Sequence, residues 1–162
     1  MDDSVSPTAR PWTNSPTAKE KNAVQRAVTA LLDELAPERV LKRAERIPIP
    51  VEQHRTPTGC VLQAANSAVS VSWFAEAGAD ATLGELHIIA WRGIVSRRGS
   101  PRRREAATIM SELVVRPIER PLDELVWRAA DGAEYDSAGL AARCVALLEE
   151  QMRADAPVQT PE

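Results

Sequence analysis

A carboxylate and an imidazole lie two residues apart in this sequence, at Glu85 and His87, and an indole follows at Trp91. The residues around them alternate in the manner of a β-strand, so the three side chains are expected on one face of a sheet. A carboxylate beside an imidazole can move protons in an active site. The solvated side of an antiparallel sheet has the same appearance. We interpret the three residues as sheet-face contacts and predict no catalytic residue.

Five arginines lie within eight residues, between two predicted strands, in a protein whose formal net charge is −3. They are Arg97, Arg98, Arg102, Arg103 and Arg104. Gly99 and Pro101 lie among them, and the segment is predicted to form a hairpin tip. Guanidinium groups bind phosphates in pairs and release counterions from nucleic acids. The tip therefore suits nucleic acid or another polyanion, an acidic partner protein, or simple solvation of the hairpin.

Motifs that would signal other chemistry are absent. The sequence contains no G-x-G-x-x-G, G-x-x-x-x-G-K-[ST], G-x-S-x-G or H-E-x-x-H pattern. His54, His87, Cys60 and Cys144 lack the paired spacing of a zinc site. We therefore predict neither a metal nor a cofactor. The two cysteines are expected to be reduced and partly buried, although a single bridge between them stays open.

Two amphipathic helices are predicted, one near each end of the chain. Thr17 and Glu20 fit a capping box at the start of the first helix. Its apolar positions recur at helical spacing: Val24, Ala27, Val28, Leu31, Leu32 and Leu35. Asp136 is expected to cap the last helix. The buried stripe of that helix comprises Leu140, Cys144, Leu147, Leu148 and Met152.

The segments between the helices read as strands. In Ala68–Trp73, the valines and the tryptophan share one face and the serines take the other. Leu86–Val95 is apolar on both sides, which indicates a central strand. A third strand contains Ile109, Leu113 and Val115 and is expected to stop at Pro117, and Leu125–Trp127 is a short strand. Ile47–Val51 holds two prolines, so it is expected at an edge of the sheet.

Helix, strands and helix in this order indicate the α+β class. We predict an antiparallel β-sheet of about 4–5 strands in meander order, flanked by an N-terminal and a C-terminal amphipathic helix. Residues 1–16 are expected to be a disordered tail, 17–154 a single domain and 155–162 a frayed tail. No apolar run is long enough to span a membrane, and no signal peptide is recognised, so a cytoplasmic location is expected.

This helix–sheet–helix order is similar, as an architecture only, to small acidic binding proteins, including secretion-chaperone-like and adaptor-like domains. We predict a non-enzymatic protein-interaction module that binds a partner protein or a second copy through its sheet face or its Ile47–Val51 edge. Nucleic-acid or polyanion binding through the Arg97–Arg104 tip is the first alternative. The second is a small-molecule site under the helices that uses Glu85 and His87. Each of three predicted strands holds a tryptophan: Trp73, Trp91 and Trp127. They either line a pocket or a binding face, or they fill the core and pack on the sheet face.

Overall fold

A computed structural model describes residues 18–36, 39–40, 50–75, 83–95, 107–121 and 124–155. Within these ranges, helix α1 (Ala18–Glu34) is the first element and helix α3 (Ser137–Asp155) is the last. Between them lie seven strands: β1 (Glu52–Thr56), β2 (Gly59–Ala64), β3 (Ser67–Phe74), β4 (Glu85–Arg92), β5 (Thr108–Arg120), β6 (Glu124–Ala129) and β7 (Glu134–Tyr135).

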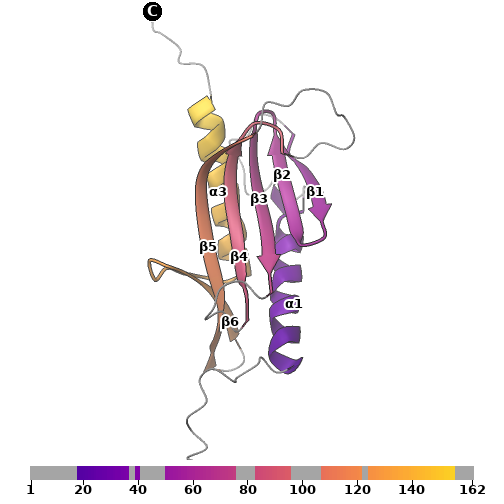
Figure 1. The fold of residues 1–162 in the computed structure, drawn as a ribbon, viewed down its shortest axis with the longest axis vertical. Coiled ribbons are helices and arrows are strands. Elements are labelled where there is room, and N and C mark those ends of the chain that lie inside the picture. Colours follow the sequence, from indigo (N-terminus) through magenta and orange to yellow (C-terminus); the bar gives the residue numbers. More distant parts are fainter. Residues whose placement is uncertain are drawn as a thin grey trace, which may run out of the picture.

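The strands form one antiparallel sheet in which each strand pairs with its neighbours in the chain, in the order β1 to β7. Both helices lie on one side of this sheet, where α3 packs against β3, β4 and α1 (Figure 1). The predicted α+β class and meander order are confirmed. In the described ranges, neither helix is long and apolar enough to cross a membrane.

The predicted number of strands is wrong, since the sheet has seven rather than four or five. Strand β1 was missed because an edge strand is solvated on one side, so its sequence Glu-Gln-His-Arg-Thr shows no apolar alternation. Strand β7 has two residues, too few for any pattern. An edge strand was predicted at Ile47–Val51. In the structure the edge strand is β1, which begins at Glu52, directly after that segment. Residues 47–49 lie outside the described ranges.

Two strand ends also differ from the prediction. Strand β5 continues through Pro117 to Arg120, because beyond Val115 it pairs only with β6. A strand with one unpaired side tolerates a proline. Strand β4 stops at Arg92 instead of reaching Val95. The backbone after it bonds to a side chain: the Gln63 amide donates to the Gly93 carbonyl at 3.1 Å, and the Val95 N–H donates to Gln63 Oε1 at 3.1 Å.

One hydrophobic core fills the space between the sheet and the helices, and both predicted helical stripes face it. Leu31 and Leu148 have no exposed surface. Trp127 on β6 is also fully buried, and its ring meets that of Trp73 on β3 edge-on, with centroids 5.8 Å apart and an interplanar angle of 73°. The sheet is therefore curved enough to bring β6 against the end of β3.

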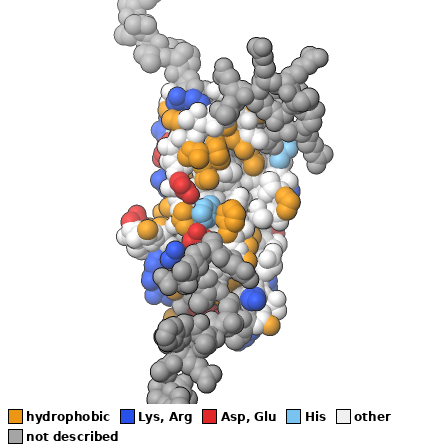
Figure 2. Space-filling view, in the orientation of Figure 1, with side chains coloured by type: hydrophobic (Ala, Val, Ile, Leu, Met, Phe, Trp, Pro, Cys, Tyr) orange, Lys and Arg blue, Asp and Glu red, His pale blue; other side chains and the backbone are white. Residues whose placement is uncertain are grey.

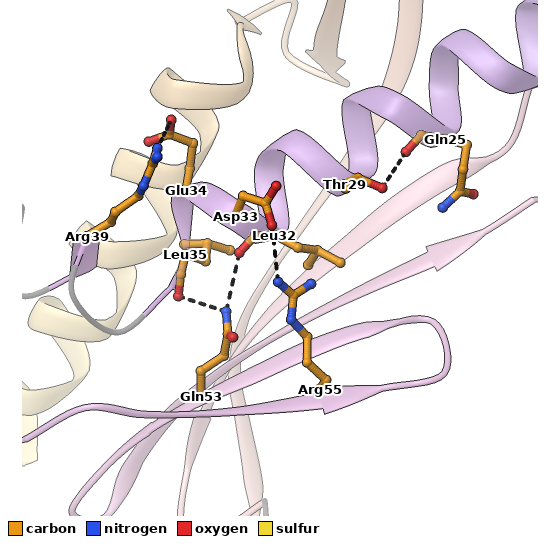
Figure 3. A network of polar contacts seen from close by, with 9 residues as sticks. All are labelled: Gln25, Thr29, Leu32, Asp33, Glu34, Leu35, Arg39, Gln53 and Arg55. Atoms are coloured by element: carbon orange, nitrogen blue, oxygen red, sulfur yellow. Dashed lines mark hydrogen bonds and ion pairs between the residues drawn. The ribbon is translucent and has the colours of Figure 1, made fainter.

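Polar contacts join α1 to β1 and cap the start of α3. Figure 3 shows Gln53 of β1, whose amide donates to the carbonyls of Leu35 at 2.8 Å and Leu32 at 3.4 Å. Both carbonyls lie at the C-terminal end of α1, where the last carbonyls of a helix lack the N–H groups of a following turn. The Leu32 carbonyl also accepts from the Leu35 N–H at 3.2 Å. Arg55 of β1 reaches Asp33 of α1 at 3.5 Å. The predicted cap of α3 is confirmed, because Asp136 Oδ1 accepts from the Gly139 N–H at 2.6 Å.

Candidate interaction surface on the outer sheet face

The side of the sheet away from the helices is called the outer face here. In β4, Leu86, Ile88 and Ala90 are fully buried against the helices. The residues between them point the other way and are partly exposed. They are Glu85, His87, Ile89 and Trp91. The expectation that Glu85, His87 and Trp91 share a sheet face is confirmed, and they do not lie under the helices. Figure 2 shows hydrophobic side chains beside a histidine and acidic groups on this face.

A network of charged side chains joins β4 to β5 at the centre of the outer face. His87 Nε2 lies 2.7 Å from Glu85 Oε1, and His87 Nδ1 lies 3.3 Å from Glu112 Oε1. The Arg116 guanidinium donates to Glu85 Oε2 through Nε and Nη2, both at 3.3 Å. Phe74 of β3 meets the His87 ring edge-on, with centroids 4.8 Å apart. We call Glu85, His87, Glu112 and Arg116 the His87 network.

Electrostatics within the His87 network favour an ionised Glu85. The hydrogen bond from His87 is the main cause that holds the pKa of Glu85 below its ordinary value. Desolvation acts in the opposite direction, and the contacts of Arg116 lower this pKa further. Both imidazole nitrogens already face carboxylates, so neither is directed at a substrate proton. The described residues also contain no group of three or more His, Cys, Asp or Glu that could hold a metal ion.

Apolar side chains gather at the end of the outer face where β4 leaves the sheet. The Trp91 Nε1–H donates to Ser70 Oγ at 2.8 Å, which draws the indole towards β3. The β4–β5 register slips between Ala90 and Trp91, so Ile109 pairs with Trp91 and Met110 is left without a partner on β4. Such a bulge redirects side chains at the end of a strand pair. We call Trp91, Ile94, Ile109 and Met110 the apolar end.

Large hydrophobic side chains are exposed at four positions in the part of the chain that the structure describes. These are Phe74, Ile94, Ile109 and Met110, with exposed fractions of 44%, 40%, 54% and 39%. Phe74 lies beside the His87 network, and the others belong to the apolar end. Five residues of this face were not predicted from the sequence as site residues: Phe74, Ile94, Met110, Glu112 and Arg116. Strand alternation could have found Glu112 and Arg116 only if the β4–β5 register had been known.

A second ionic group joins the last three strands. Glu134 of β7 accepts hydrogen bonds from Arg120 of β5 and from Arg128 of β6, whose Nη2 lies 2.6 Å away. These bonds, with that from Arg120 the larger cause, lower the pKa of Glu134 to about 2. A single carboxylate thus holds two guanidinium groups from different strands.

The remaining predicted residues lie elsewhere. The five arginines of the Arg97–Arg104 segment are outside the described ranges. Cys60 and Cys144 are free thiols and fully buried, and burial is the main cause that raises the pKa of both, that of Cys60 to about 11. An open pocket of about 500 Å³ runs along α1. Its lining residues all belong to α1: Asn22, Gln25, Arg26, Thr29, Ala30 and Asp33.

Comparison with known proteins found no family model, no curated protein and no solved structure that matches this chain.

Proposed function

We propose that this protein is a non-enzymatic interaction module that docks a partner protein on its outer sheet face. The observation that carries the proposal is the distribution of exposed hydrophobic side chains. In the described ranges, all four large ones lie on the outer face or at its apolar end. The opposite face is covered by α1 and α3 (Figure 1). Apolar groups gathered on one face and surrounded by charged ones are typical of a protein-docking surface.

The edges at β1 and β7 suit docking less well than the outer face. Strand β1 has five residues, carries Glu52, His54 and Arg55, and is flanked by Pro50 and Pro57. Short length, charge and proline all discourage the addition of another strand. Strand β7, at the other end of the sheet, has only two residues with which an added strand could pair. We therefore favour the outer face over the edge near Val51 that the sequence suggested.

Two matched variants test the outer face. Ile109→Asp places a charge at the most exposed hydrophobic residue of the apolar end, and Gln25→Asp places the same charge on the exposed side of α1. Each variant is immobilised and used to capture proteins from lysate of the native cell, beside sedimentation of the purified protein to detect self-association. Because central apolar contacts dominate most interfaces, Ile109→Asp should weaken capture or self-association about tenfold or more. Gln25→Asp should leave it unchanged.

The opposite result would overturn the proposal. Loss through Gln25→Asp alone would place the contact on α1. Equal behaviour of the two variants and the wild type would leave no role for the apolar end. Thermal unfolding of both variants is the necessary control, since Ile109 is exposed and its replacement should change the melting temperature by no more than about 2 °C.

Polyanion binding through the five arginines remains the alternative that the sequence suggests. Salt separates it from protein docking, because phosphate binding weakens steeply as ionic strength rises. Labelled duplex and single-stranded nucleic acid should be titrated at two salt concentrations, with the wild type and with a variant in which all five arginines are replaced by glutamine. Tight, salt-sensitive binding that this variant loses would favour the alternative. No binding at low salt would remove it.

A further inference from the structure

The position of His87 between two carboxylates has a consequence that depends on its protonation. Its two ring nitrogens face Glu85 on the same strand and Glu112 on the neighbouring strand, at 2.7 and 3.3 Å. A protonated imidazole has two N–H groups, so it can donate a hydrogen bond to Glu85 and form an ion pair with Glu112 at the same time. A neutral imidazole has one N–H group and one lone pair, so it can donate to only one of them.

We propose that the His87 network is a proton-dependent clamp between β4 and β5, which is closed when the imidazole is protonated and releases Glu112 when it is neutral. In the neutral ring the remaining proton stays on Nε2, which makes the shorter of the two contacts, to Glu85. The lone pair of Nδ1 then faces the Glu112 carboxylate, and the two repel each other. Glu112 is about half exposed, at 47%, so its side chain has solvent into which it can move.

The groups around His87 determine how the charge of the outer face changes. On its own strand it meets Glu85, and on β5 it meets Glu112, while Arg116 reaches it only through Glu85. On β3 its neighbours are Phe74 and Ser72, which carry no charge. The protonated network thus has two positive and two negative groups. Loss of the His87 proton leaves one net negative charge at the centre of the outer face.

Histidine is the side chain whose charge ordinarily changes between about pH 5 and 8, whereas glutamates are ionised throughout that range. The clamp concerns the protein alone and does not depend on the proposed docking of a partner. A partner that contacts Glu112 would sense the same change.

A double-mutant cycle at two pH values tests the clamp. Melting temperatures are measured at pH 5.5 and pH 8.5 for the wild type, Glu112→Gln, His87→Gln and the double variant. For a partly exposed ion pair, Glu112→Gln should lower the melting temperature by about 1–4 °C at pH 5.5. At pH 8.5 this loss should vanish or reverse. In the His87→Gln background, Glu112→Gln should cause no loss of melting temperature at either pH.

Glu119→Gln provides the matched control, since Glu119 is an exposed glutamate on the same strand and its replacement should give the same small effect at both pH values. Nitrogen-detected NMR of the imidazole adds a direct measurement, and both His87 nitrogens should carry protons at pH 5.5. The clamp is refuted if Glu112→Gln costs the same at both pH values, if the cost persists in the His87→Gln background, or if one ring nitrogen is bare at pH 5.5.

Discussion

Replacement of Gly59 by alanine should destabilise the sheet more than any glycine-to-alanine change in an open turn. A Cβ atom at this position would lie 1.7 Å from the carbonyl oxygen of Val71, where ordinary contact begins at 3.4 Å, so the shortfall is 1.7 Å. The clash is with backbone, which no side-chain rotation can relieve. Strands β2 and β3 must therefore separate. The adjacent hydrogen bond from the Trp73 N–H to the Thr58 carbonyl, at 2.8 Å, is strained with them.

The magnitude follows from these two effects. Overpacking in a well-packed region costs about 1–3 kcal/mol, and the lost hydrogen bond costs about 1 kcal/mol. We therefore expect Gly59→Ala to lower the free energy of unfolding by about 2–4 kcal/mol. That is a large part of the about 5–15 kcal/mol that stabilises an ordinary domain. Urea unfolding followed by tryptophan fluorescence measures the change, because Trp127 is fully buried.

Gly132→Ala is the matched control for this experiment. Gly132 lies in the turn between β6 and β7 with φ of 90°, and nothing lies within 4 Å of an added Cβ. Only the backbone conformation opposes this substitution, at a cost of about 1 kcal/mol. If Gly59→Ala lowers the free energy of unfolding no more than Gly132→Ala does, the Val71 carbonyl does not come close enough to residue 59 to clash with a Cβ atom.

Two further predictions concern titratable groups. The folded-state pKa of Glu134, about 2, lies below its ordinary 4.5, so its stabilising effect is complete above about pH 4.5 and is lost as the pH falls towards 2. The wild type should therefore be more stable than Glu134→Gln at neutral pH, and their unfolding curves should converge in acid; curves that stay equally separated would contradict this. With a pKa of about 11, Cys60 is ionised in only about one molecule in a thousand at pH 8. Both Cys60 and Cys144 should therefore react with iodoacetamide at least about 100-fold more slowly in the folded protein than in urea, and rapid labelling of the folded protein would refute their burial.

Local periodicity accounts for the parts of the fold that the sequence predicted correctly. The stripes of α1 and α3, the alternation in β3 and the central position of β4 all come from spacing within one segment. The shared face of Glu85, His87 and Trp91 follows from the same rule, because alternate residues of a strand point the same way.

Pairing between distant segments accounts for what the sequence did not predict. Glu112 and Arg116 reach His87 and Glu85 only through the β4–β5 register, which no single segment specifies. The bulge that leaves Met110 unpaired on β4 is a property of two strands together. Strand β1 lies at the edge of the sheet, where solvent on one side allows a polar sequence. Its place in the sheet depends on the other strands, so its own residues did not reveal it.

Site-specific photo-crosslinking in the native cell tests the proposed docking surface most directly. A photoreactive amino acid is placed at position 109, on the apolar end, and in a separate variant at position 25, on α1. Docking on the outer face should give a discrete protein adduct, either with a partner or with a second copy of this chain, from position 109 and none from position 25. An adduct from position 25 alone, or none from either position while both variants remain folded, would contradict docking on the outer sheet face.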